Sequence, residues 1–227
     1  PRSTLFPYTT LFRSRTGVYG RATSSNVQAV MWTIGELGLA CNRLDYGHVH
    51  GGLDSLDFLA MNPNGLVPVV IDGDGAPIWE SAAIVRYLCA RYASEPFWPT
   101  DPLARSRADM WAEWGKTTLG RAFSEPIFWA VIRKRAAERD PAALAEARRR
   151  FDGILDILEA RLNISPFVGG DEFTFADMMV GHLFYRYFTL EIFRKERPVL
   201  ERYYATLKER PAFREHVMVS YDSLRAG

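Results

Sequence analysis

A change of periodicity near residue 92 constrains the fold of this chain more than any other feature. Up to that point, short apolar segments alternate with helical patterns, whereas beyond residue 102 every apolar pattern repeats with a helical period. The stretch between them, ASEPFWPTDP, contains three prolines and is typical of a linker. We therefore expect an α/β unit over residues 15–92, a linker over 93–102 and an all-helical unit over 103–227.

The first unit predicts a small mixed sheet with helices. Asp72-Gly73-Asp74-Gly75 is a hairpin signal between two strand patterns. Gly38 ends the first helix, and Ser24, Ser25 or Asn26 can cap its start. The expected order is strand, helix, strand, short helix, two strands and helix, at residues 18–20, 24–37, 41–44, 55–60, 69–71, 76–79 and 80–92.

The second unit contains helix signals alone. Aspartates stand directly before Pro102 and Pro141, where a capping acid and a proline suit a helix start. Thr174 and Asp177 have capping-box spacing, and Pro126 predicts a kink in the first helix of this unit. The expected helices are at about 103–136, 141–163, 174–189, 198–209 and 211–218.

Charge and composition exclude several classes of function. The chain has 28 Lys plus Arg against 27 Asp plus Glu, so no excess of one sign favours nucleic acid or an anionic membrane surface. No apolar run approaches the length of a membrane span. Cys41 and Cys89 form no CxxC pair and predict a reduced, cytoplasmic protein. Only four of the 28 basic residues are Lys, which favours a GC-rich bacterial genome.

The stretch Thr4–Ser14, TLFPYTTLFRS, fits neither unit because its apolar residues follow no helical or alternating period. These eleven residues read as the in-frame translation of a short-read sequencing adapter. We therefore interpret residues 1–14 as a non-native artefact and leave them out of the reasoning about the fold.

Three motifs in this order and spacing resemble the glutathione transferase family over residues 17–218. They are ATSSNVQ at residues 22–28, NPNGLVP at 62–68 and WESAAI at 79–84. The resemblance implies a thioredoxin-like N-terminal domain of the theta-like, serine type, followed by an all-helical domain. The box at 174–177 also occupies the place of the family's folding motif.

The resemblance implies a glutathione-binding role for Val67 and Pro68. A proline at a strand edge is common without any function. The family, however, implies a cis Val67–Pro68 bond that leaves the Val67 N–H and C=O free to pair with an extended tripeptide.

Glu80 and Ser81 begin a helix, where an acid and a capping hydroxyl are favourable in any protein. A helix N-terminus also binds anions. We expect Ser81 to donate to the γ-glutamyl carboxylate of glutathione and Glu80 to accept from its ammonium group.

Ser24 is the expected thiolate donor, because serine-type members of the family carry the donor four residues before the position of Gln28. A hydroxyl at a helix N-terminus is suited to stabilising the anion of a thiol. Ser25 is a second candidate, Thr23 a third, and both serines have the alternative role of helix caps. No cysteine lies at residues 22–26, which argues against the cysteine-type members that exchange disulfides.

Two further groups are weaker candidates. His48 and His50 flank a glycine loop and could reach the glycyl carboxylate, although solvated histidines are the commoner case. Trp111, Trp114 and Phe123 follow a near-helical spacing that fits either a pocket for the second substrate or the core and a dimer interface.

The resemblance implies an enzyme that activates the thiol of its co-substrate glutathione for attack on a small apolar electrophile, without a metal. It also implies a cytoplasmic homodimer with a role in detoxification. The alternatives are a non-catalytic binding or regulatory module of the same fold, and a glutathione-dependent isomerase or dehalogenase.

Overall fold

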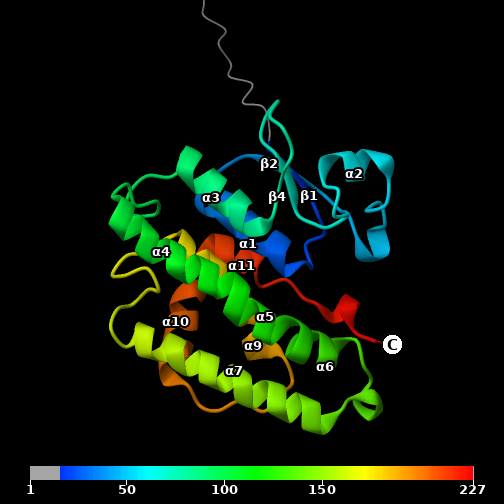
Figure 1. Ribbon diagram of the computed structural model, residues 1–227, viewed down its shortest axis with the longest axis vertical. Helices are drawn as coiled ribbons and strands as arrows, with labels where there is room; N and C mark the ends of the chain where they lie inside the picture. Colours follow the sequence, from blue (N-terminus) through cyan, green and yellow to red (C-terminus); the bar gives the residue numbers. More distant parts are fainter. Residues whose placement is uncertain (1–15, 227) are drawn as a thin grey trace, which may run out of the picture.

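The computed structural model describes residues 16–226, and the predicted artefact at residues 1–14 lies outside them. A small α/β domain packs on a larger helical domain, as the change of periodicity predicts (Figure 1). The connecting segment runs from the end of α3 to the start of α4 and has no regular secondary structure.

In the described part of the chain, four strands form one mixed sheet in the order β2-β1-β3-β4. The first two strands pair in parallel, with Val18 opposite Arg43, and β3 pairs antiparallel to both β1 and β4. The predicted hairpin at residues 72–75 is confirmed by this last pairing. The last strand is shorter than the expected 76–79. The bounds are β1 (Thr16–Tyr19), β2 (Cys41–Leu44), β3 (Val69–Ile71) and β4 (Ile78–Trp79).

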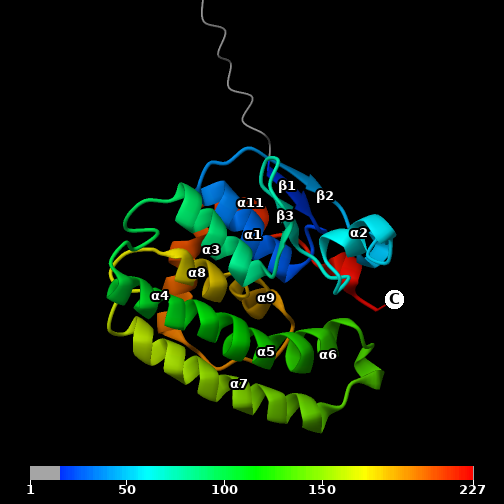
Figure 2. The ribbon, with the colours of Figure 1, turned by 45° about the horizontal axis from the view of Figure 1, so that its top comes forward.

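Two of the helices of this domain, α1 and α3, lie between the sheet and the helical domain (Figure 2). Val27, Val30 and Ile34 of α1 are fully or almost fully buried, which is why their helical spacing was informative. The third helix, α2, begins after Ser55, whose side chain accepts a hydrogen bond from the Phe58 N–H. The bounds are α1 (Ser25–Glu36), α2 (Leu56–Met61) and α3 (Ser81–Tyr92).

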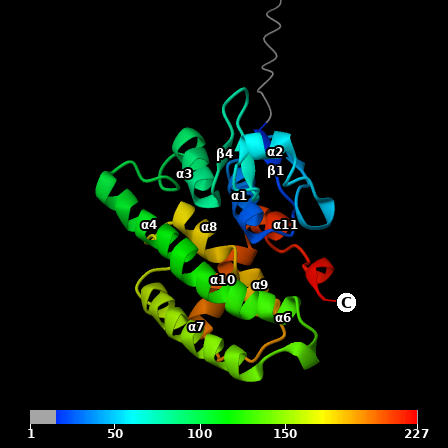
Figure 3. The ribbon, with the colours of Figure 1, turned by 45° about the vertical axis from the view of Figure 1, so that its right-hand side comes forward.

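A long helical segment crosses the molecule, with α7 beside it (Figure 1; Figure 3). Two π-helical turns interrupt it, at Gly115–Leu119 and Ser124–Trp129. The second contains Pro126, whose missing N–H removes one α-helical hydrogen bond. A π-helical turn therefore stands where the sequence predicts a kink. The segment ends at Ile132 rather than at residue 136. Its α-helical parts are α4 (Pro102–Trp114), α5 (Gly120–Phe123) and α6 (Ala130–Ile132).

The predicted capping box before α8 is confirmed: Thr174 accepts from the Ala176 N–H, and Asp177 Oδ2 accepts from the Thr174 N–H at 3.0 Å. The helix expected at 174–189 is broken, because the chain leaves α8 at His182 and restarts after Leu183. The helices are α7 (Pro141–Leu162), α8 (Phe175–Gly181), α9 (Phe184–Thr189), α10 (Pro198–Lys208) and α11 (Pro211–His216).

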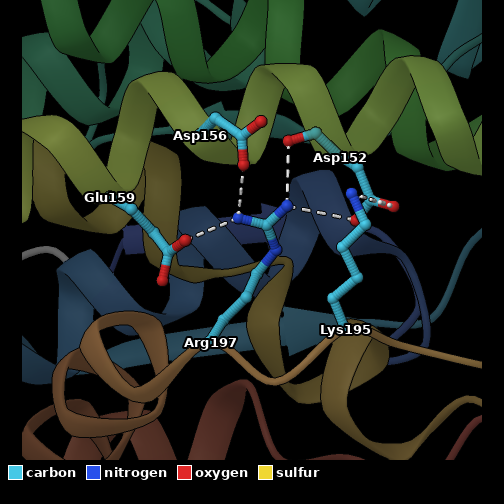
Figure 4. Close-up of polar contacts among 5 residues, drawn as sticks. All are labelled: Asp152, Asp156, Glu159, Lys195 and Arg197. Atoms are coloured by element: carbon cyan, nitrogen blue, oxygen red, sulfur yellow. Dashed lines mark hydrogen bonds and ion pairs between the residues drawn. The ribbon is translucent and has the colours of Figure 1, made fainter.

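Arg197, at the start of α10, links the segment between α9 and α10 to α7 through ion pairs (Figure 4). Its side chain is 4% exposed. Nη1 donates to Asp156 at 2.8 Å and to Glu159 at 2.6 Å, and Nη2 donates to the carbonyl and carboxylate of Asp152. Lys195 adds a longer ion pair to Asp152 at 3.6 Å.

The two domains share one apolar core. Trp32 of α1 is fully buried, and its ring lies 4.8 Å from that of Phe213 and 5.7 Å from that of Phe173. At the edge of this contact, Arg210 donates two hydrogen bonds of 2.7 Å to Glu36. Because the core is continuous, the helical domain holds α1 in a fixed position.

Candidate active site

Ser24 occupies the N-cap of α1, and its residue is 9% exposed. Its side chain makes no capping hydrogen bond, so within the described chain the hydroxyl is not used by the helix. Ser25, the first residue of α1, is half-buried and does not cap the helix either. Both serines line a cavity between the two domains, whereas Thr23 does not.

Glu80 and Ser81 form the start of α3. Glu80 has a φ of 70°, a left-handed conformation that costs a residue other than glycine about 1–3 kcal/mol. The next residue, Ser81, is 1% exposed, and its hydroxyl donates to Asn26 Oδ1 at 3.3 Å. The predicted sites at the starts of α1 and α3 therefore meet at Asn26.

The Val67–Pro68 bond is cis, as the resemblance implied. Val67 lines the larger cavity, of about 550 Å³, together with Ser24 and Ser25. Val67 and Pro68 also line a smaller cavity of about 180 Å³ with Glu80 and Ser81. The two cavities adjoin, since Asn26, Leu66, Val67 and Lys116 line both.

Lys116, in the first π-helical turn, is a site residue that the sequence did not reveal. Its Nζ donates to Ser81 Oγ at 2.9 Å and to Asn26 Oδ1 at 3.0 Å, and lies 3.9 Å from Glu80 Oε2. Burial lowers the pKa of this lysine, while the charge of Glu80 opposes that shift. No motif surrounds Lys116, so nothing in the sequence separates it from a surface lysine.

Two arginines place positive charge beside the Ser24 loop. Arg21 lines the larger cavity, and its Nε is buried without a partner in the described chain. Arg186 of α9 is 3% exposed, packs on the Phe128 ring and donates from Nη2 to the Thr23 carbonyl at 2.6 Å. Burial, with a smaller effect from Arg21, lowers the pKa of Arg186 to about 10.

His182, which lines the larger cavity, is buried and titratable. Its Nδ1 lies 3.0 Å from the Met178 carbonyl oxygen, so Nδ1 carries the proton and donates it. Burial lowers its pKa to about 3, and the charges of Lys116 and Arg186 add to this effect. His182 is therefore neutral at physiological pH.

The aromatic residues proposed for a second-substrate pocket lie elsewhere. Phe123 is buried in the core against Phe151, and Trp111 packs against Trp114, so none of these lines the larger cavity. Trp129, the last residue of the second π-helical turn, supplies an aromatic wall of that cavity instead. His48 and His50, in a short 3₁₀ helix, do not line either cavity.

The chain matches known proteins over both domains. Residues 18–96 match the family model for the glutathione S-transferase N-terminal domain, and residues 141–206 match that for the C-terminal domain. Glutathione S-transferase GstB of Escherichia coli is 38% identical over 203 residues, which are 89% of this chain and 97% of that protein. Glutathione S-transferase 3 of Zea mays is 33% identical, over 70% of this chain and 72% of that protein.

Among solved structures, the theta class glutathione S-transferase of Xanthomonas axonopodis pv. citri with glutathione bound superposes with a TM-score of 0.86. It is 36% identical and covers 91% of this chain and 99% of its own. This chain therefore belongs to the glutathione S-transferase family, and the predicted thioredoxin-like plus all-helical fold and enzyme family are confirmed. Within residues 16–226, none of the helices is both long and apolar enough to span a bilayer.

Proposed function

We propose that this chain binds reduced glutathione across the two adjoining cavities and activates its sulfur at Ser24. The observation that carries this proposal is that Ser24 lines a cavity at the start of α1 while its side chain makes no capping hydrogen bond. The smaller cavity, with Glu80 and Ser81, takes the γ-glutamyl end of the tripeptide. The backbone of Val67 then pairs with its central residue.

The chemistry follows from the pKa of the thiol. A free thiol titrates near pH 8.5, so only a few per cent is thiolate at neutral pH. Lowering that pKa by two units requires about 2.7 kcal/mol of preferential stabilisation of the anion. The Ser24 hydroxyl donates to the sulfur, and the positive end of the α1 dipole adds to the stabilisation. Ser25 lies one residue further along the same helix and is the second candidate donor.

The second substrate lies in the larger cavity, beside the sulfur. Leu53, Leu66, Trp129 and Leu183 supply apolar walls for the body of a small electrophile. The thiolate forms a bond to the electrophilic carbon, and the leaving group departs with the electron pair of the bond that breaks. The gain in rate comes from positioning and from stabilisation of the anion.

The pKa of the bound thiol, followed by its ultraviolet absorbance against pH, tests this proposal. We expect Ser24→Ala to raise that pKa by about two units toward the value of a free thiol, and to lower kcat/KM at neutral pH about 10- to 100-fold. The matched variant Ser25→Ala keeps a hydroxyl at position 24 and is expected to leave the pKa unchanged. Equal thiol pKa values in the parent protein and Ser24→Ala would contradict the proposal.

Activity against a panel of chloro- and epoxide-bearing acceptors separates the alternatives. A binding or regulatory module of the same fold binds glutathione without conjugating any of them. An isomerase or dehalogenase consumes the acceptor but releases free glutathione, so the ratio of glutathione lost to acceptor lost distinguishes it from a transferase.

We also propose a twofold homodimer in the cytoplasm of a bacterium, with a role in detoxification. Several large apolar side chains are exposed on both domains: Val49 and Leu56 on the first, Leu103 and Met110 on α4 of the second. A pairing of the first domain of one subunit with the helical domain of its partner covers both groups. Light scattering coupled to size exclusion tests it, and a monomer at micromolar concentration contradicts it.

A further inference from the structure

Lys116 comes from the helical domain but ends in the cavity formed by the first domain. The backbone next to it lies unusually deep, because a Cβ on Gly115 would come within 2.7 Å of the Met179 carbonyl oxygen of α8. Gly115 and Lys116 begin the π-helical turn, a conformation that is frequent at functional sites. The lysine side chain therefore starts close to α8 and extends to the start of α3.

The Nζ of Lys116 is the centre of a small polar cluster. It contacts Ser81 Oγ at 2.9 Å and Asn26 Oδ1 at 3.0 Å, with Glu80 Oε2 further away at 3.9 Å. The side chain of Lys116 is 28% exposed, whereas that of Glu80 is 57% exposed. The ammonium group is thus partly removed from water, and its pairing with the carboxylate is long. A cation in this position gains from a closer anion.

The ligand of the proposed function offers such an anion. The γ-glutamyl residue carries a carboxylate and an ammonium group on one carbon. Ser81 and Lys116 are donors that match the carboxylate, and Glu80 is an acceptor that matches the ammonium. Binding replaces the long Lys116–Glu80 pair by one ion pair from each residue to the ligand.

We propose that Lys116 binds the α-carboxylate of the γ-glutamyl residue of glutathione, so that the helical domain takes part in recognising the tripeptide. This inference rests on the proposed binding of glutathione and adds a residue that neither the motifs nor the family match assigns. Since the carboxylate is distant from the reacting sulfur, Lys116 contributes equally to the ground state and the transition state. Its loss therefore raises KM and leaves kcat at saturating glutathione within about twofold.

The test compares glutathione with γ-aminobutyryl-cysteinyl-glycine, which lacks only the α-carboxylate of the first residue. Isothermal titration gives the Kd of each peptide for the parent protein, Lys116→Met and Lys116→Arg. We expect Lys116→Met to weaken the binding of glutathione about 10- to 100-fold and to change the Kd of the analogue by less than about twofold. Lys116→Arg keeps the charge and is expected to recover a large part of the affinity for glutathione.

The control is Lys134→Met, which removes an exposed lysine after α6 and is expected to change neither Kd. Equal weakening of both peptides by Lys116→Met would show that the lysine only supports Asn26 and Ser81, and would overturn the inference. Unchanged glutathione affinity would overturn it as well. An increase in the pKa of the bound thiol in Lys116→Met would instead place Nζ beside the sulfur, and this result would also overturn the inference.

Two different results separate an error in the role of Lys116 from an error in the proposed function. One result is that the parent protein binds glutathione with a lowered thiol pKa while Lys116→Met has the same Kd and the same thiol pKa. In that case only the proposed role of Lys116 is wrong. If Lys116→Met loses affinity as expected but Ser24→Ala leaves the thiol pKa unchanged, only the proposed thiolate donor is wrong.

Discussion

Arg186 of α9 donates a hydrogen bond of 2.6 Å from Nη2 to the carbonyl oxygen of Thr23, 163 residues earlier in the chain. Thr23 directly precedes Ser24, so a buried guanidinium of the helical domain fixes the backbone that carries the proposed thiolate donor. Within the described residues, no carboxylate pairs with Arg186.

We expect Arg186→Met to reduce activity more than stability. The substitution loses a hydrogen bond to a buried carbonyl, worth about 1–3 kcal/mol, but also removes a buried charge without a carboxylate partner. The net loss in the free energy of unfolding is therefore about 1 kcal/mol. The Ser24 loop becomes less fixed, and kcat falls about tenfold. Urea unfolding and steady-state rates check this, with Arg150→Met on the exposed face of α7 as the control. An unchanged kcat would contradict the expectation.

The acceptor cavity is expected to favour compounds that carry a carboxylate. Arg21 and Arg121 line it, and neither forms an ion pair with a carboxylate in the described chain. At saturating glutathione, an acceptor with a carboxylate should have a KM about 3- to 10-fold lower than its amide, because Arg21 is only half-buried. Arg21→Met should remove most of this difference, whereas Arg149→Met should not. The same KM ratio in Arg21→Met and in the parent protein would refute this role.

His182 makes the stability of the protein sensitive to acid. Its folded pKa of about 3 is far below the ordinary value near 6.5, so the unfolded chain binds this proton more readily. The stability is complete above about pH 6.5 and decreases as the pH falls toward 3, with a loss of about 2 kcal/mol by pH 5. Urea unfolding at about pH 7 and pH 5 measures this loss. His182→Gln should flatten the dependence, whereas His50→Gln, in an exposed 3₁₀ helix, should not. Equal slopes in the two variants would exclude His182 as the cause.

Substitutions in the Arg197 cluster are expected to lower the free energy of unfolding, and to lower it more where the replaced side chain is more buried. Arg197→Met leaves three carboxylates near one another without their buried cation, and should cost about 2–4 kcal/mol of unfolding free energy. Asp156→Asn removes a carboxylate that is 65% exposed and should cost less than about 1 kcal/mol. Chemical denaturation of both variants compares the two. A larger cost for Asp156→Asn than for Arg197→Met would show that the burial of the arginine does not govern the cluster.

The amino-acid sequence determined the features that depend on neighbouring residues. The order of strands and helices, the hairpin at residues 72–75 and the capping box of Thr174 and Asp177 all follow from local backbone and side-chain preferences. The helix starts that carry Ser24 and Glu80-Ser81 were found for the same reason, and their motifs gave the family. The predicted ends of helices and strands are less accurate, because tertiary contacts and the π-helical turns determine where the helices end.

Tertiary structure alone decided which distant residues meet at the site. Lys116 and Arg186 have no motif around them, yet one reaches Ser81 and the other holds Thr23. The sequence left two roles open for Trp111, Trp114 and Phe123, and the structure places Phe123 in the core, while Trp129 lines the cavity. The physical reason is that periodicity records which face of a helix is buried, but not which other element buries it.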